Sequence, residues 1–92
     1  MATGPVVQRM MIHLVTIIST AYESEKGLGL TPQGPMFLAF NQQGYNIDYF
    51  NNLIKIGVEM GYWTSTPETI KLTPIGIEKA KRFSEIEKAH NN

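Results

Sequence analysis

The stretch that decides the fold runs Gly61-Tyr-Trp-Thr-Ser-Thr-Pro-Glu-Thr-Ile-Lys-Leu-Thr-Pro-Ile-Gly-Ile-Glu-Lys-Ala-Lys-Arg-Phe83. Its first residue, Gly61, can take the left-handed conformation that ends a helix. Residues 62–64 and 69–72 have the aromatic and β-branched composition of strands, and residues 65–68 between them are turn formers. The stretch therefore predicts the end of one helix followed by a two-stranded ribbon.

A new helix should start directly after the ribbon. The Thr73 hydroxyl can accept a hydrogen bond from an unpaired amide, and Pro74 suits the first helical position because its missing N–H would have no partner there. The pentapeptide Leu72-Thr-Pro-Ile-Gly76 has a counterpart in Leu30-Thr-Pro-Gln-Gly34. Because the flanking residues differ, we interpret the repeat as one local solution used twice, a strand end followed by a Thr-Pro helix start, rather than as a duplication.

Three further helices are predicted upstream, at about residues 5–22, 35–44 and 46–60. Gln33 or Thr31 is the expected cap of the second helix, and Asn46 is the expected cap of the third. The polar, glycine-bearing segment 23–29 predicts a loop. Residues 28–30 are candidates for a short strand that pairs beside the ribbon. A short helix, a glycine-containing turn and a longer helix together form a helix-turn-helix.

This order of elements resembles the winged helix-turn-helix superfamily, in particular small MarR- and PadR-like regulators, in which a strand ending in Leu-Thr-Pro-x-Gly leads into the last helix. The resemblance covers most of residues 28–83. It implies an α+β fold with a three-helix core, a two-stranded wing and a C-terminal helix. We therefore expect residues 1–92 to be a single winged-helix domain with its core at about 5–89 and a frayed C-terminal tail. It further implies a cytoplasmic, homodimeric DNA-binding regulator of transcription.

The composition sets the outer limits. Ninety-two residues support one hydrophobic core. Eight basic and eight acidic residues cancel to a formal charge of zero, whereas proteins that bind phosphate backbones usually carry a positive excess. Only 17% of the residues are charged, which predicts some apolar surface for a partner. The chain has no cysteine, and polar residues interrupt its N-terminal apolar stretch, so we expect neither thiolate chemistry nor a membrane span.

In the family, the third helix enters the major groove of double-stranded DNA. Its core side is expected to hold Ile47, Phe50, Ile54, Gly57 and Val58. On the opposite side, an asparagine amide can pair with an adenine edge, and lysine or tyrosine can contact phosphate or a base. The expected DNA contacts, with the one cation of the ribbon included, are Asn46, Tyr49, Asn52, Lys55 and Lys71.

Other features favour a different use of the fold. Asp48 and Glu59 would repel the phosphate backbone, and the ribbon tip carries Glu68. The third helix also presents the apolar residues Ile56 and Met60. The alternative is therefore a winged helix that binds a protein partner and no DNA.

The first helix predicts self-association. Its apolar residues sweep about half the circumference, which is wider than the arc of about 100° that packing on one side needs. We expect one edge, Val6, Met10, Ile17 and Ala21, to be buried in its own domain. The other edge is expected to form a homodimer interface through Met11, Val15, Ile18 and Tyr22.

The remaining residues predict no chemistry. His13 is expected to be a packed or interface residue, because the only other histidine is His90, in the C-terminal tail. Tyr62 and Trp63 are expected to pack beneath the ribbon. The basic residues of the last helix alternate with glutamates at helical spacing, which is typical of a solvated face. With no nucleophile beside a base and no metal-ligand cluster, we expect no enzyme activity, cofactor or metal site.

Overall fold

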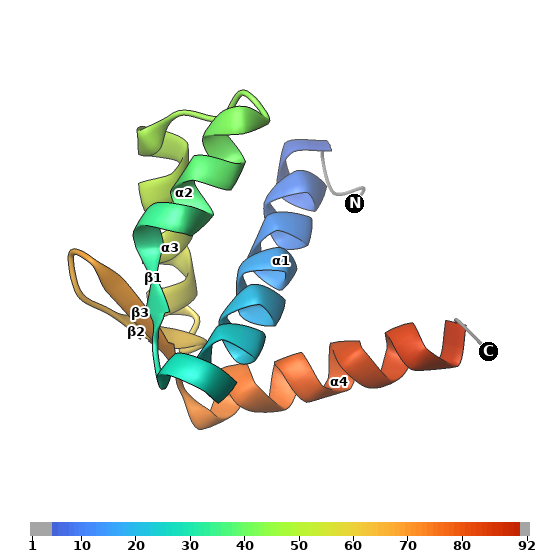
Figure 1. Ribbon diagram of the computed structural model, residues 1–92. Coiled ribbons are helices and arrows are strands. Elements are labelled where there is room, and N and C mark those ends of the chain that lie inside the picture. Colours follow the sequence, from blue (N-terminus) through green and yellow to red (C-terminus); the bar gives the residue numbers. More distant parts are fainter. Residues whose placement is uncertain (1–4, 91–92) are drawn as a thin grey trace.

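The computed structural model describes the backbone of residues 5–90 and the side chains of residues 7–86. The expected frayed tail falls largely outside this range. The described part is an α+β domain with four helices and a three-stranded antiparallel sheet (Figure 1). In chain order the elements are α1 Pro5–Leu28, β1 Thr31–Pro32, α2 Gln33–Gln42, α3 Ile47–Glu59, β2 Trp63–Ser65, β3 Thr69–Leu72 and α4 Pro74–His90.

The predicted ribbon is present as the hairpin β2–β3. Trp63 pairs with Leu72 and Ser65 with Ile70, and β1 adds to the free side of β3, so the strand order is β1-β3-β2. The turn is closed by the Thr66 amide, which donates to the Thr69 carbonyl at 2.9 Å. The sequence therefore placed the ribbon correctly, to within a residue at each strand end.

The first helix is longer than predicted, and the expected loop at 23–29 is wrong. Polar residues here continue the helix, since Lys26 pairs with Glu23 at 3.2 Å and lies over the Tyr22 ring. The helix ends only at Gly29, whose φ of 76° is left-handed. This extension moves the first strand from the predicted 28–30 to Thr31–Pro32.

The second helix starts without the predicted cap. Pro32 occupies the N-cap position and no side chain caps the helix. The Thr31 hydroxyl instead donates to the Ala21 carbonyl, which ties β1 to α1. The Gln33 side chain donates to the Thr66 carbonyl at 2.8 Å and to the Thr69 carbonyl at 3.1 Å. These long-range bonds fasten the hairpin to the start of α2, where the Gln33 amide donates to the Glu68 carbonyl at 2.8 Å.

The turn into α3 and its start agree with the prediction. Gly44 is left-handed, with φ of 95°, and the Asn46 side chain accepts from the Tyr49 amide at 2.9 Å. At the other end, Met60 caps the helix and Gly61 is left-handed, with φ of 80°.

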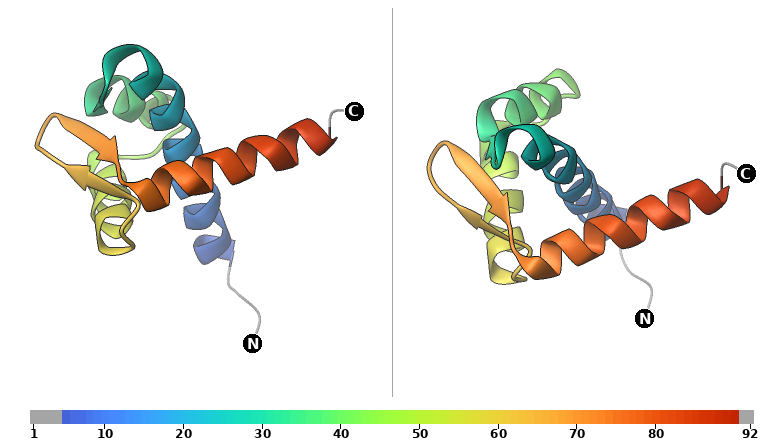
Figure 2. Two further views of the ribbon diagram at one scale, coloured as in Figure 1. Left: turned by 90° about the horizontal axis from the view of Figure 1, so that it is seen from below. Right: turned by 60° about the horizontal axis from the view of Figure 1, so that its bottom comes forward.

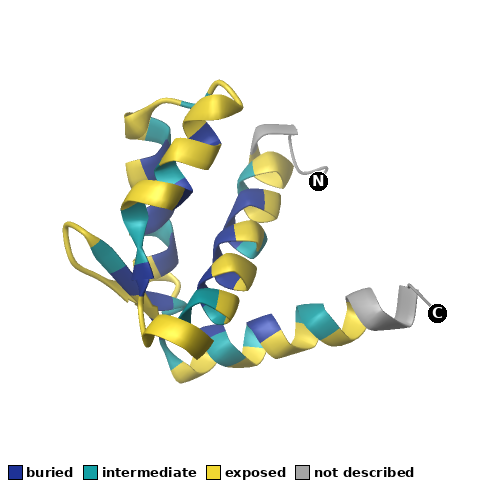
Figure 3. Ribbon diagram, viewed as in Figure 1, coloured by how far each residue is buried: buried dark blue, intermediate teal, exposed yellow. Residues whose placement is uncertain are grey.

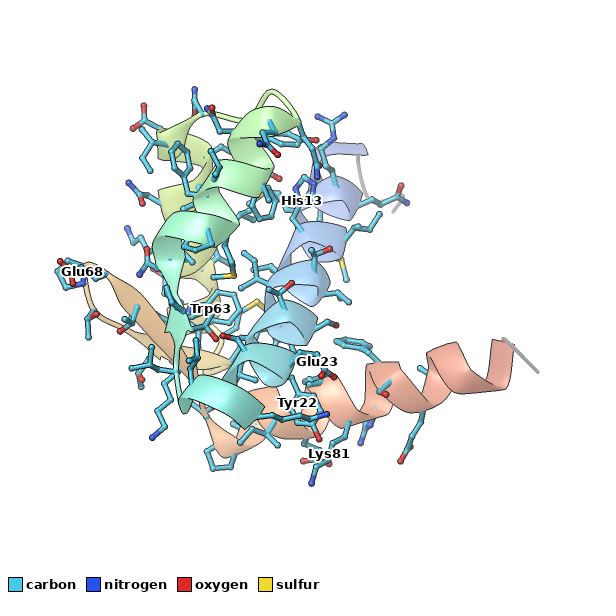
Figure 4. All side chains as sticks on the ribbon, viewed as in Figure 1. His13, Tyr22, Glu23, Trp63, Glu68 and Lys81 are labelled. Atoms are coloured by element: carbon cyan, nitrogen blue, oxygen red, sulfur yellow. The ribbon has the colours of Figure 1, made fainter. Side chains whose placement is uncertain are left out.

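Trp63 joins α3 to the hairpin. It is 1% exposed, and its indole Nε1–H donates to the Ile54 carbonyl at 2.9 Å. The ring lies so close to Gly57 that a Cβ at that position would overlap it. Trp63, which is labelled in Figure 4, and the half-buried Tyr62 therefore pack in the domain, as predicted. Figure 3 shows in dark blue the buried parts of α1, α3 and the sheet that form the core around them.

The start of α4 also agrees with the prediction. The Thr73 hydroxyl accepts from the Gly76 amide at 3.2 Å and donates to the Gly61 carbonyl. From this anchored start, α4 crosses the C-terminal half of α1 and then projects away from the rest of the domain (Figures 1 and 2). The N-terminal half of α1 and the far half of α4 thus diverge.

Candidate nucleic-acid interface

The solvent-exposed side of α3 carries a row of polar residues. We call this row the outer stripe: Asp48, Asn51, Asn52, Lys55 and Glu59. The spacing of three and four residues places them along one side of the helix. The middle of the outer stripe offers two amides and one ammonium group, with a carboxylate at each end.

The opposite side of α3 differs in part from the prediction. Phe50, Ile54 and Gly57 are buried as expected, and Leu53 is buried with them. The assignment of Ile47 and Val58 to the core is wrong, since they are 46% and 42% exposed. Both positions lie at the edge of the buried arc, Ile47 three residues before Phe50 and Val58 four after Ile54, so helical spacing alone does not separate them from the core.

Two of the predicted DNA contacts serve the structure of the helix start. The Asn46 side-chain oxygen accepts from the Tyr49 amide, so it is engaged in capping. Tyr49 is half-buried, and its hydroxyl lies 2.6 Å from Nδ1 of His13 on α1. Tyr49 is therefore turned toward α1 and away from the outer stripe.

His13 is a packed residue, as predicted, and it lies in an aromatic cluster on the side of α1 that faces α2 (Figure 4). Its ring meets those of Phe40, Tyr45 and Tyr49 edge to face, with centroid distances of 5.0, 4.8 and 5.6 Å. Burial, and then the positive charge of Arg9, lower the pKa of His13. Burial raises the pKa of Tyr49. Both groups are therefore held in their neutral forms at neutral pH.

Lys71 lies apart from the outer stripe. It is exposed on the central strand β3, opposite Thr64. Burial raises the pKa of Glu25 in the last part of α1, and the hydrogen bond from the Leu72 amide and then the charge of Lys71 oppose this rise only in part. Glu68 sits at the hairpin tip (Figure 4). Of the predicted contacts, the structure thus brings only Asn52 and Lys55 together on the outer stripe.

Sequence reasoning missed Asn51. It is exposed and lies four residues before Lys55, on the same side of α3. That spacing was available in the sequence and was the signal for including it.

Only part of the predicted dimer edge of α1 is exposed to solvent. Met11 is 59% exposed, and Val15 and Tyr22 are half-buried, but Ile18 is 1% exposed. The prediction for Ile18 is therefore wrong, because it is part of the core of its own chain. Ile17 and Ala21 are buried as expected and Met10 is half-buried, whereas the side chain of Val6 lies outside the described residues.

A groove opens where α1 and α4 diverge. Its volume is about 280 Å³, and it is lined by Met11, Leu14, Val15, Ile18, Met60, Tyr62, Lys79 and Phe83. We call it the α1–α4 groove. Apart from one lysine and one tyrosine hydroxyl, its lining is apolar, and it includes Phe83 from the projecting helix.

Among residues 7–86, no group of three or more histidine, cysteine or acidic side chains is placed to hold a metal ion. Within the described helices, none is long and apolar enough to cross a membrane. No protein-family model, curated protein or solved structure matches the chain.

Proposed function

We propose that this protein is a winged helix-turn-helix regulator of transcription that binds double-stranded DNA as a homodimer. The observation that carries the proposal is the exposed outer stripe on α3, the second helix of a helix-turn-helix, with the β2–β3 hairpin packed beside that helix. In this class of fold such a helix enters the major groove.

The chemistry of the outer stripe indicates how it would bind. Asn51 and Asn52 carry amides, which can pair bidentately with adenine edges. Lys55 can neutralise a phosphate. With one cation on the stripe of each protomer, affinity would rest on base contacts more than on the backbone, and its salt dependence would be shallow.

The homodimer would form through the α1–α4 groove. Two-fold interfaces use the same patch on both copies, and here the apolar groove is lined in part by α4, the helix that projects from the domain. Ile86, on the projecting part of α4, is 53% exposed and has the apolar character that such a groove accepts. The zero formal charge of the chain means that two copies do not repel each other over a long range.

Light scattering coupled to size exclusion tests the dimer. We expect twice the chain mass for the wild type and a shift toward the monomer for Met11→Glu, because a charge would be buried without a partner. Leu38→Glu is the matched control, since Leu38 is 57% exposed on α2 and lies outside the groove. A wild type that stays monomeric at high micromolar concentration would contradict the dimer.

A second candidate is a protein-interaction module without DNA binding. The outer stripe carries two carboxylates against one ammonium, and Val58 and Met60 at the end of α3 are 42% and 51% exposed. Acidic ends and an exposed apolar pair suit a protein surface better than a phosphate backbone.

Salt titrations of duplex binding separate the two candidates. For DNA binding, the dimer should prefer half-sites about 10 base pairs apart, and log affinity should fall only shallowly with log salt, since Lys55 is the one cation on the outer stripe of each protomer. Lys55→Ala should weaken binding to all sequences and flatten the slope. Asn52→Ala should relax preference at one base pair per half-site, at about 1–3 kcal/mol.

Lys81→Ala is the matched control for charge, because it removes an exposed lysine of α4 far along the chain from α3. No binding near about 50 mM salt, or binding that ignores both α3 substitutions, would favour the protein-interaction module.

A further inference from the structure

We propose that the contact between His13 and Tyr49 is an acid-sensitive latch, which holds the start of α3 against α1 and opens when the His13 imidazole takes up a proton. This goes beyond the proposed function and does not require that α3 bind DNA.

The geometry makes the contact a junction of several elements. The 2.6 Å hydrogen bond between Nδ1 of His13 and the Tyr49 hydroxyl connects residues 36 positions apart. Phe40 of α2 and Tyr45 of the following turn pack on the same imidazole. Tyr45 in turn stacks on Tyr49, with centroids 4.9 Å apart and planes 23° from parallel. One buried ring thus contacts α2, the turn and the first turn of α3.

The groups around the ring supply no negative charge to a cation. On its own helix the charged neighbour is Arg9, which is positive. The residues facing it from the other elements are Phe40 on α2, Gln43 at the C-cap of α2, Tyr45 in the turn and Tyr49 on α3. None of these carries a carboxylate, and no ion pair to His13 is present among the described residues. An imidazolium would therefore be buried beside another positive charge.

Protonation also changes the hydrogen bond. In the neutral pair, one partner donates and the other accepts. In the tautomer whose hydrogen lies on Nε2, the Tyr49 hydroxyl donates to Nδ1. A proton that enters from solvent and binds Nδ1 reverses this bond, so that Nδ1 donates and the hydroxyl must direct its own hydrogen elsewhere. Among the described residues, His13 is the only hydrogen-bond partner of that hydroxyl. Opening to water relieves both the buried charge and the unpaired hydroxyl hydrogen.

The opening acts on the start of α3. Tyr49 forms the latch through its hydroxyl, and its backbone amide donates to the Asn46 side chain that caps the helix. Release of Tyr49 therefore loosens the cap and the first turn, where the outer stripe begins with Asp48. If α3 binds DNA as proposed, acid would change its affinity. The latch itself can be measured without DNA.

The test uses NMR on the whole chain carrying His90→Gln, which leaves His13 as its only imidazole. Ring shifts give the pKa of His13. Amide hydrogen exchange at residues 50–53, corrected for intrinsic rates, gives the opening constant of α3. We expect opening to increase on acidification with the same midpoint as the ring. From neutral to acid pH, the opening constant should rise by a total of about tenfold for each pH unit by which the closed structure lowers the pKa of His13.

Three variants make the result specific. Arg9→Gln should raise the pKa of His13 and move the opening midpoint to higher pH by the same amount. Tyr49→Phe should increase opening at neutral pH, and His13→Gln should abolish its pH dependence. Glu25→Gln is the control, because that carboxyl also titrates in acid but bonds to Leu72 in another part of the fold, so the α3 transition should remain. Protection at residues 50–53 that is constant through the His13 titration, or a midpoint unmoved by Arg9→Gln, would overturn the latch.

Discussion

Substitution of Gly57 by alanine should destabilise the protein, although alanine is the better helix former. Gly57 lies inside α3 and is buried against the indole of Trp63. An added Cβ would overlap the six-membered ring of the indole, so the ring or α3 must move. Any such shift also strains the bond from the Trp63 Nε1–H to the Ile54 carbonyl, now 2.9 Å long.

The magnitude follows from three opposing effects. Replacing glycine in a helix interior should gain about 1 kcal/mol. Overpacking costs about 1–3 kcal/mol, and leaving the buried indole N–H unpaired costs about 1–3 kcal/mol more. We therefore expect the free energy of unfolding to fall by about 1–5 kcal/mol.

The assay is urea unfolding followed by far-UV circular dichroism, at one fixed protein concentration so that association does not shift the midpoint. Gly34→Ala is the matched control. A Cβ on Gly34 meets nothing within 4 Å, so this variant should be equal to or up to about 1 kcal/mol more stable than the wild type. Gly57→Ala should destabilise the Trp63→Phe variant by less than it destabilises the wild type, because the smaller ring leaves space for the added methyl group. A Gly57→Ala protein as stable as the wild type would refute the packing argument.

Two other predictions concern single side chains. Thr73→Ala should reduce the free energy of unfolding by about 0.5–2 kcal/mol, because the Gly76 amide loses its acceptor, and Thr73→Ser should retain most of it. An unchanged urea midpoint for the alanine variant would mean that the hydroxyl does not cap α4. Glu25→Gln tests the raised pKa of that carboxyl, whose stabilising contribution is present below its ordinary pKa and is lost as the pH rises through the folded pKa. In urea unfolding, the variant should be at least as stable as the wild type at neutral pH. Its advantage in stability should be smaller at about pH 4. A variant that is less stable than the wild type by the same amount at both pH values would contradict the raised pKa of Glu25.

The parts of the fold that the sequence predicted correctly depend on neighbours along the chain. The asparagine cap of α3 and the Thr-Pro start of α4 are satisfied by amides three residues away. The left-handed glycines at 44 and 61 end helices because only glycine adopts that conformation without strain. Such features need no knowledge of the rest of the fold.

The candidate site was predicted less completely, for a related reason. The polar side of α3 could be expected from helical periodicity, and Asn52 and Lys55 do lie there. Tyr49 could not be assigned in that way. Its position on the helix fits either side, and the choice is made by His13, a residue 36 positions earlier.

From the sequence alone, the order of the elements, the caps of α3 and α4 and the hairpin followed, because those rest on hydrogen bonds and backbone preferences within a few residues. Only the tertiary structure decided which apolar residues are covered. Ile18 is buried under other elements of its own chain, while Ile47 and Val58 stay exposed. The tertiary structure also decided that α1 continues to Leu28. Glu25, in this added part of the helix, accepts a hydrogen bond from the distant Leu72 amide. Burial depends on which distant elements pack together, and local periodicity does not contain that information.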